Sequence, residues 1–493
     1  MSEVTSVIPR SEQPDHPFLS GNYAPVREEL TATDLAVSGT IPDYLDGRYL
    51  RVGPNPLRDP DPDRYHWFFG DGMAHGLRLR DGKAQWYRNR WIRSAALSRA
   101  LGEPWPGGPH FGGFDFAGNT NIVGHAGRTL VLTEAGVRPY ELTDELETVG
   151  GSDFCGTLFG GYSAHPKRDP ETDELHAVSY HPMRGNKVQY TVTGTDGRVR
   201  RTVDIALDSQ TMMHDFSLTE RFVVIYDMPV TLDFGTMVKN KPGRSLAELV
   251  SRFVARHSAP DFVLRAAMRG SERSAAPSGM PYRWTPEKMA RVGVMPREGT
   301  AADMRWFEVP QCYVFHPLNA FDDGDRIVLD VVRHPSVFTT GRRLFEQPTL
   351  DRWIVDLSTG KVTEQRLDDH GQEFPRVDER LVGRRHRFGY TVGHTTTAES
   401  GAPDAILRHD LLNGETRRIT FGTGREPGEF VFVPSAPDAA EDDGVAMGFV
   451  YDRGADRSDL VLLDAQTLET VGTVHLPARV PHGFHGNWVP TQG

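Results

Sequence analysis

The chain has 493 residues, of which 38% are hydrophobic and 25% charged, a balance typical of a folded globular protein rather than a disordered one. Its net charge of −12 is spread along the sequence without a long basic run, which argues against nucleic acid as a partner. Two cysteines, Cys155 and Cys312, are too few and too far apart for a disulfide framework or a thiolate zinc site. We expect both to be small apolar positions near strands.

The N-terminal stretch, about residues 1–22, is predicted to be an extended arm. It lacks the basic and then apolar pattern of a signal peptide, and no apolar run in the chain reaches the ~18 residues of a membrane span. These features favour a cytoplasmic protein.

Short hairpins recur along the whole chain. In each, an Asp or Thr-Asp opens a tight turn between two alternating strands, and Gly often supplies the positive φ. Examples are HGLRLRDGKAQWY, YELTDELETVG, QYTVTGTDGRVRRTVDI, WIVDLSTGKVTEQRL, LRHDLLNGETRRITF and LVLLDAQTLETVGTVHL. No strands alternate with long helices, so the pattern predicts an all-β protein built from a repeated antiparallel unit, a β-propeller.

Two segments interrupt the hairpins with helical patterns. The first, from Trp91 to Gly108, spaces its apolar residues for one or two amphipathic turns and includes Trp105. The second belongs to an insertion at about 239–290, in which Leu249 and Phe253 share an apolar stripe that Ser245 is placed to cap. Either segment could line the way in for an apolar substrate, and the basic residues around the second would suit a membrane surface. Of these two roles, we favour packing of that helix onto the propeller, and contact with a membrane is the alternative.

The chain contains nineteen histidines, and none of them lies in a local metal motif such as HExxH. A metal site would therefore have to be assembled from distant positions, which a propeller allows because the inner strands of its blades converge on one axis. Histidines at strand ends fit this role, and the local patterns leave several open. The candidates are His75, His165, His181, His214, His316, His334, His482 and His485.

Several longer segments together resemble the carotenoid cleavage oxygenase family. They include LDGRYLRVGPNP, HWFFGDGMAHG, EFPRVDERLVG, AEDDGVAMGFVYD and RVPHGFHGNWVP, and the resemblance covers nearly all of residues 1–493 as a single domain. It implies a seven-bladed propeller, with inserted loops and helices forming a cap over an axial iron site.

Matched motif by motif, the resemblance assigns the four ligands of an Fe(II) ion to His165 in AHP, His214 in MHD, His316 in FHP and His485 in GFHG. His75, His181, His334 and His482 are then expected to be ordinary buried histidines. The resemblance also assigns Glu134, Glu373 and Glu429 to the carboxylates that accept from the other ring nitrogens and so fix the imidazoles. No catalytic side chain is expected beyond the iron centre.

The implied reaction is insertion of both atoms of O2 across one C=C bond of a carotenoid or apocarotenal, which gives two aldehydes or ketones. Stilbene-cleaving members tend to have a Lys where GHAGRTL places Arg128, so we favour carotenoids over stilbenoids. A retinoid isomerase and a propeller that only binds apolar ligands remain alternatives. Peripheral contact of the basic amphipathic stretch with the inner face of a membrane is kept as the alternative to its packing onto the propeller.

Overall fold

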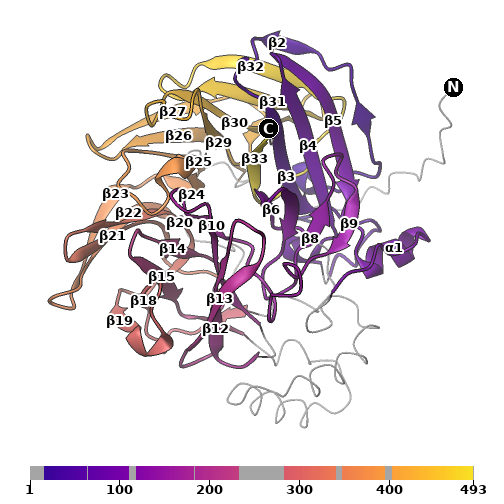
Figure 1. The fold of residues 1–493 in the computed structure, drawn as a ribbon. Helices are drawn as coiled ribbons and strands as arrows, with labels where there is room; N and C mark the ends of the chain where they lie inside the picture. The colour runs from indigo at the N-terminus through magenta and orange to yellow at the C-terminus, as the bar shows by residue number, and fades with distance from the viewer. Residues whose placement is uncertain are drawn as a thin grey trace.

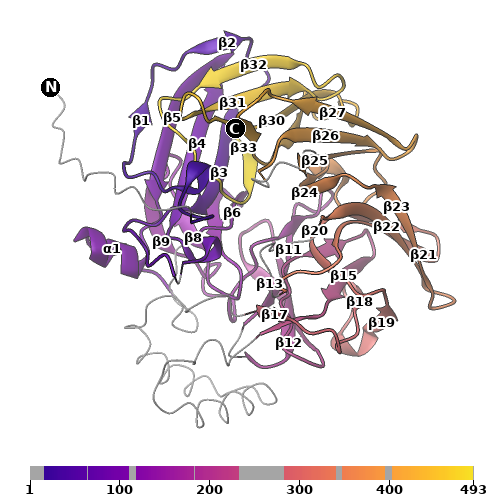
Figure 2. The same ribbon diagram turned by 180° about the vertical axis from the view of Figure 1, so that it is seen from behind.

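The computed structural model describes residues 16–63, 65–109, 118–181, 184–232, 282–339, 347–394 and 402–491. Within them, seven antiparallel sheets of four or more strands follow one another in a ring (Figure 1; from behind, Figure 2). This radial repetition is a β-propeller, so the predicted all-β class and its seven blades are confirmed. The predicted cap over the axis stays a prediction.

The first three blades follow one another along the chain, except that blade 1 also takes its inner strand from the C-terminal end. Blade 1 consists of β1 (Thr31–Ala32), β5 (Lys83–Trp91), β4 (Gly72–Arg80), β3 (Gly47–Pro54) and β33 (Gly486–Pro490). Blade 2 consists of β6 (Asn121–His125), β7 (Arg128–Leu132), β8 (Tyr140–Leu142) and β9 (Thr148–Gly151). Blade 3 consists of β10 (Lys167–Arg168), β11 (Leu175–Tyr180), β12 (Lys187–Thr193) and β13 (Val199–Ala206).

Blade 4 has an interruption between its second and third strands. It consists of β14 (Phe216–Leu218), β15 (Phe222–Asp227), β18 (Arg291–Pro296) and β19 (Arg305–Glu308). Between β15 and β18 lies the two-stranded sheet of β16 (Val230–Leu232) and β17 (Tyr282–Trp284). The stripe with Leu249 and Phe253 lies outside the described residues, and residues 282–290, which begin with β17, are the described part of the predicted insertion.

The remaining blades complete the ring. Blade 5 consists of β20 (Tyr313–Asp323), β21 (Arg326–His334), β22 (Thr349–Asp356) and β23 (Val362–Asp368). Blade 6 consists of β24 (Gly371–Arg376), β25 (Phe388–His394), β26 (Ala405–Asp410) and β27 (Glu415–Thr420). Blade 7 consists of β28 (Arg425–Pro427), β29 (Val431–Pro434), β30 (Gly444–Asp452), β31 (Arg457–Asp464), β32 (Thr470–His475) and β2 (Val37–Gly39).

Strands from the two ends of the chain close the ring twice. The C-terminal strand β33 pairs with β3 of blade 1, and the N-terminal strand β2 pairs with β32 of blade 7. Each closure joins segments that are far apart in the sequence, so neither blade is complete until both ends are in place. The domain bounds and the N-terminal arm stay predictions, because residues 1–15 and most of the insertion are not described.

In the part of the chain that the structure describes, helices are few and short. The helix α1 (Ala95–Leu101) begins at Ser94, whose hydroxyl accepts from the backbone N–H of Leu97, and ends at Gly102, which has a φ of 72°. This confirms the helical turns predicted between Trp91 and Gly108. Among the described residues, no helix combines the length and the apolar composition needed to cross a bilayer. The 3₁₀ turns are η1 (Gly21–Tyr23), η2 (Trp67–Phe69), η4 (Ala301–Asp303) and η5 (Glu379–Leu381).

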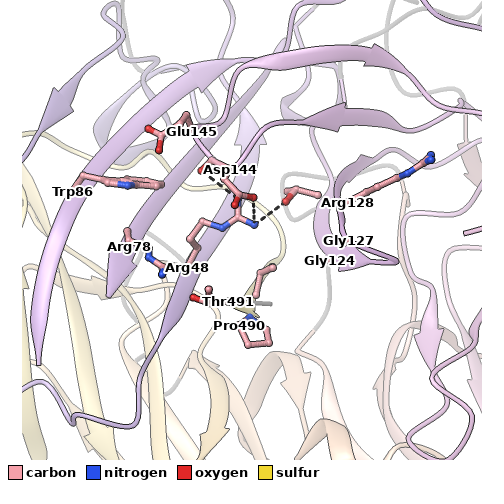
Figure 3. Close-up of a pocket in the computed structure, with 12 residues that line it drawn as sticks. Arg48, Arg78, Trp86, Gly124, Gly127, Arg128, Asp144, Glu145, Pro490 and Thr491 are labelled. Carbon is pink, nitrogen blue, oxygen red and sulfur yellow. Dashed lines mark hydrogen bonds and ion pairs between the residues drawn. The ribbon is translucent and has the colours of Figure 1, made fainter. Parts of the chain in front are cut away.

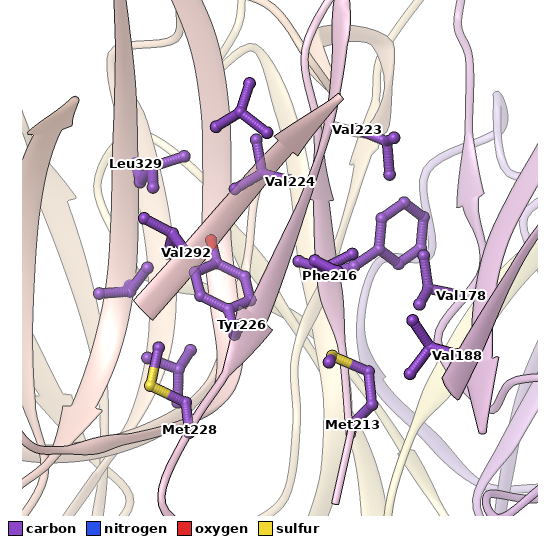
Figure 4. Close-up of a cluster of buried hydrophobic side chains, with 14 of the residues drawn as sticks. Val178, Val188, Met213, Phe216, Val223, Val224, Tyr226, Met228, Val292 and Leu329 are labelled. Carbon is purple, nitrogen blue, oxygen red and sulfur yellow. The ribbon is translucent and has the colours of Figure 1, made fainter. Parts of the chain in front are cut away.

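The largest hydrophobic cluster fills the space between blades 3, 4 and 5 (Figure 4). Met213 and Phe216 belong to it and are fully buried, one on each side of His214 in the sequence. Burial of side chains of this size contributes roughly 1.5–3 kcal/mol each. The core therefore anchors the chain on both sides of His214 and fixes the direction of its ring.

Candidate metal centre

Four histidines lie at the inner ends of four different blades. His165 precedes β10, His214 precedes β14, His316 lies within β20, and His485 directly precedes β33. In β20 the pairing register shifts between Val314 and Pro317, a bulge that interrupts the alternation of side chains at His316. All four side chains are buried.

The four rings converge on one point. One nitrogen from each of His165, His214, His316 and His485 lies within 4.8 Å of the other three. Four nitrogens bound to one ion at about 2.1 Å could be at most about 4.2 Å apart. The observed spread is thus close to that of a complete four-nitrogen metal site.

Hydrogen bonds fix the tautomers of three of these rings. The Nδ1 atoms of His214, His316 and His485 lie 2.8, 2.6 and 2.9 Å from carboxylate oxygens, so each Nδ1 carries the proton and donates it. Nε2 is then the nitrogen left on each ring to bind a cation, and the Nε2 atoms of His214 and His316 lie 3.1 Å apart, a separation that a shared proton or a metal ion would stabilise. Two lone pairs this close repel each other unless a cation lies between them. The residues therefore fit a metal ion.

The carboxylates are Glu134 for His214, Glu373 for His316 and Glu429 for His485. The structure thus brings the three predicted glutamates together with three of the four predicted ligands. Such carboxylate partners orient a metal-binding imidazole and raise its basicity.

The charge states of these groups follow from burial and from their neighbours. Burial and the adjacent imidazoles hold the pKa of His165 well below its usual range, so this ring is neutral. Burial also lowers the pKa of His485 to about 4, although Glu429 opposes the shift. Burial disfavours the charge on Glu429, but His485 and Arg376 outweigh it and lower the pKa of that carboxyl to about 2.

Further side chains hold the glutamates, and sequence reasoning did not assign them this role. The hydroxyl of Tyr180 donates to Glu134 at 2.8 Å and also contacts the hydroxyl of Tyr282. Glu373 accepts from Nε2 of His334 at 2.8 Å, so His334 is more than an ordinary buried histidine. Arg376 lies 3.4 Å from Glu429. No local motif distinguishes these residues, because each acts across a blade boundary.

The other histidines set aside in the sequence lie apart from the cluster. Nδ1 of His75 is 2.9 Å from the hydroxyl of Tyr87, and Nε2 of His482 is 2.8 Å from Glu426. His181 is buried at the end of β11 and belongs to no metal-binding group among the described residues.

The cysteines differ from each other. Cys312 is buried, and burial raises the pKa of its thiol to about 12, as expected for a structural position. Cys155 is exposed, which departs from the expected apolar position near a strand. Its φ of 60° places it in a turn outside the sheet, and its sulfur accepts from Arg128 at 3.2 Å.

Arg128 lies far from the histidine cluster. It begins β7, whereas Glu134 follows the other end of that strand, roughly 20 Å away at about 3.3 Å per residue. It borders a cavity of about 330 Å³ that also contains Arg48 and Arg78 (Figure 3). The identity of Arg128 therefore says nothing about the substrate near the metal.

Of the three residues predicted to line the substrate path, the structure describes one. Trp105 follows α1 and is 37% exposed, while Leu249 and Phe253 lie outside the described residues. Aromatic rings do border the histidines: Phe315 is 5.1 Å from His214, and Phe374 is 5.6 Å from His316, measured between centroids.

Comparison with known proteins decides the family. A sequence profile described as retinal pigment epithelial membrane protein matches residues 23–490. The chain is also 52% identical to the carotenoid cleavage oxygenase of Mycobacterium tuberculosis, over 98% of this chain and 99% of that protein. The chain belongs to the carotenoid oxygenase family. It is 32% identical to carotenoid 9,10(9',10')-cleavage dioxygenase 1 of Pisum sativum, over 96% of this chain and 90% of that protein.

Solved structures of other carotenoid oxygenases agree with this fold. The lignostilbene dioxygenase of Pseudomonas brassicacearum has a TM-score of 0.81 at 26% identity, covering 98% of this chain and all of that one. The cobalt-substituted apocarotenoid oxygenase of Synechocystis has a TM-score of 0.77 at 25% identity, covering 96% and 98%. The predicted family and enzyme class, a dioxygenase, are confirmed by these relatives.

Proposed function

We propose that this carotenoid oxygenase is a non-haem Fe(II)-dependent dioxygenase that cleaves one C=C bond of a carotenoid or apocarotenal. Both atoms of O2 enter the products, one in each new carbonyl group. The observation that carries the proposal is the convergence of four imidazole nitrogens within 4.8 Å in a chain 52% identical to a carotenoid cleavage oxygenase.

The proposed metal is iron, held by His165, His214, His316 and His485. Imidazole nitrogens suit iron, copper, nickel and zinc alike, so the ligands alone do not choose among these metals. The proposed reaction favours iron among these metals, because bound ferrous iron supplies the dioxygen chemistry that amino-acid side chains lack. Four protein ligands would leave coordination positions open, unlike a closed structural site.

The glutamates have two roles in this proposal. They hold the three imidazoles in a fixed direction, and their charge balances that of the ion. Glu134, Glu373 and Glu429 together contribute −3, and Arg376 beside Glu429 contributes +1. The remaining −2 matches one divalent cation.

The substrate is proposed from the relatives and from the surroundings of the site. Phe315 and Phe374 place apolar ring surfaces beside the histidines, which suits a conjugated hydrocarbon chain. The relatives with the highest identity given above are named for carotenoid cleavage. The structural similarity to a lignostilbene dioxygenase keeps a stilbenoid substrate as the alternative.

Product analysis tests the proposal. We expect Fe(II)-loaded protein with ¹⁸O2 to convert a carotenoid or apocarotenal into two carbonyl products with one labelled oxygen each, measured by chromatography with mass detection. A hydroxystilbene in a parallel reaction should remain intact. Products from the stilbene alone would favour the alternative, an isomer without label would indicate an isomerase, and no conversion would leave only ligand binding.

We further propose peripheral contact with a membrane through the basic amphipathic stretch that contains Leu249 and Phe253. Its support is the sequence pattern, in which Lys and Arg flank an apolar stripe. The double variant Leu249→Ser, Phe253→Ser should sediment with anionic liposomes less than the wild type. Equal sedimentation of both proteins would assign this segment to the core. The cytoplasmic location stays a prediction.

A further inference from the structure

The four proposed ligands are not held alike. His214, His316 and His485 each donate from Nδ1 to a glutamate oxygen at 2.6–2.9 Å. Among the residues that the structure describes, no glutamate contacts His165 in this way. A different carboxylate faces its Nδ1, that of Asp215, whose Oδ2 lies 3.9 Å away.

The two ring nitrogens of His165 face different groups. Its Nε2 is buried and has no hydrogen-bond partner, and its ring centroid lies 4.4 Å from that of His214 and 4.6 Å from that of His485. Nε2 therefore faces the other imidazoles, and Nδ1 faces Asp215. A metal bound at Nε2 would require a proton on Nδ1, and this proton needs an acceptor.

Asp215 is buried, and its carboxylate is already engaged. Its side chain is 2% exposed, Oδ1 accepts from the backbone N–H of Phe216 at 2.7 Å, and Oδ2 accepts from Nζ of Lys167 at 2.9 Å. The oxygen that faces His165 is thus the one that the lysine holds. A separation of 3.9 Å is too long for a direct hydrogen bond.

Polar side chains border a cavity at this contact. His165, Lys167 and Asp215 all border a cavity of about 710 Å³ that also reaches His316 and His485. A water molecule in this cavity could join Nδ1 to Oδ2, and a small rotation of either side chain would join them directly.

We propose that the carboxylate of Asp215 accepts the hydrogen bond from Nδ1 of His165, and that this bond is weaker than the three that the glutamates accept. It is weaker because Oδ2 of Asp215 also accepts from Lys167. The inference rests on the metal site of the proposed function. Lys167 also cancels the charge of Asp215, so that the three glutamates and Arg376 alone balance a divalent ion. Asp215 is thus a positioning residue, and His165 is the ligand that is released most easily.

Cobalt binding to the metal-free full-length protein tests this inference without any turnover. Asp215→Asn should weaken Co(II) affinity by ~10–100-fold and shift the visible absorption bands of the bound ion. Lys167→Met, which frees Oδ2, should bind Co(II) at least as tightly as the wild type. The matched control is Asp330→Asn, which removes another fully buried carboxylate, paired with Arg352 at 2.7 Å on blade 5, and should leave affinity and bands unchanged.

Wild-type affinity and bands in Asp215→Asn would overturn the inference, and so would a Lys167→Met variant that binds Co(II) more weakly than the wild type. If Asp215→Asn fails to fold, the wild-type Co(II) protein gives a second measurement. Among its hyperfine-shifted imidazole N–H signals in proton NMR, one should exchange with solvent faster than the other three, and four equal rates would contradict the proposal. Wild-type protein that binds Co(II) but, when loaded with Fe(II) instead, cleaves no polyene would refute the proposed function alone.

Discussion

Two buried histidines of this protein have similar partners and yet different expected roles. His214 lies 2.8 Å from Glu134, and His482 lies 2.8 Å from Glu426. Only the free nitrogen of His214 faces other imidazoles. The carboxylate contact alone therefore does not mark a metal ligand, but the direction of the second nitrogen does.

This difference gives a prediction at the residue scale. His214→Ala should lose iron binding and polyene cleavage, because only three imidazoles remain and Glu134 loses the imidazole that donates to it. His482→Ala is the matched control and should keep its iron. Iron content by atomic absorption and turnover of an apocarotenal measure both variants, and a His214→Ala protein with one iron and full turnover would refute the assignment.

Local sequence could not identify the ligands among the nineteen histidines. The segments around His181 and His334 have the same His-Pro pattern as those around His165 and His316. What separates them is the approach of four blades to one point, and no local pattern encodes that. The four proposed ligands and three glutamates were assigned through the family motifs, whereas the contacts of His334, Tyr180 and Arg376 became visible only in the structure.

At the scale of the strand, turn chemistry made the hairpins predictable. All six hairpins expected from the sequence form antiparallel pairs, including β4 with β5 and β26 with β27. In the turn between β4 and β5, Asp81 and Gly82 have φ values of 50° and 66°, as a tight two-residue turn requires. The closures by β2 and β33 were not predicted, because pairing across the whole length of a chain leaves no local signal.

The closure at β33 depends on a glycine. Gly47 pairs with Pro490, and a Cβ added to it would lie 2.5 Å from the ring of Trp488 and 2.7 Å from the carbonyl oxygen of Val489. Gly47→Ala should therefore force β3 and β33 apart and cost about 1–3 kcal/mol of stability.

Thermal unfolding followed by circular dichroism measures this effect. Gly454→Ala is the control, since its added Cβ would have only Asp452 Oδ1 nearby, at 3.3 Å. Equal melting temperatures for the two variants would show that the closure tolerates the extra carbon.

For the molecule as a whole, the buried site makes stability depend on pH. In the metal-free protein the pKa of His485 is lowered from 6.5 to about 4 by burial, whereas the unfolded chain takes up this proton near 6.5. Acid therefore favours the unfolded state as the pH falls from 6.5 through 4. Glu429 adds to this, because its pKa of about 2 lies below the ordinary 4.5, and its contribution is lost as the pH falls from 4.5 through 2.

We thus expect the melting temperature of the metal-free protein to fall steadily once the pH drops below about 6.5. Differential scanning calorimetry across a pH series measures it. Glu429→Gln should flatten the part of the curve below about 4.5, since this side chain no longer titrates. A melting temperature that stays constant between about pH 7 and pH 5 would contradict the low pKa of His485.

The closure of the ring also determines when the metal site can exist. His165, His214 and His316 lie in consecutive blades, but His485 follows the remaining strands of blade 5 and all strands of blades 6 and 7 except β2. On the ribosome, three of the four proposed ligands therefore emerge well before the fourth is synthesised. The nascent chain can offer only a partial site, and capture of the metal by all four imidazoles has to wait until translation has passed His485 and β33 has joined the first blade.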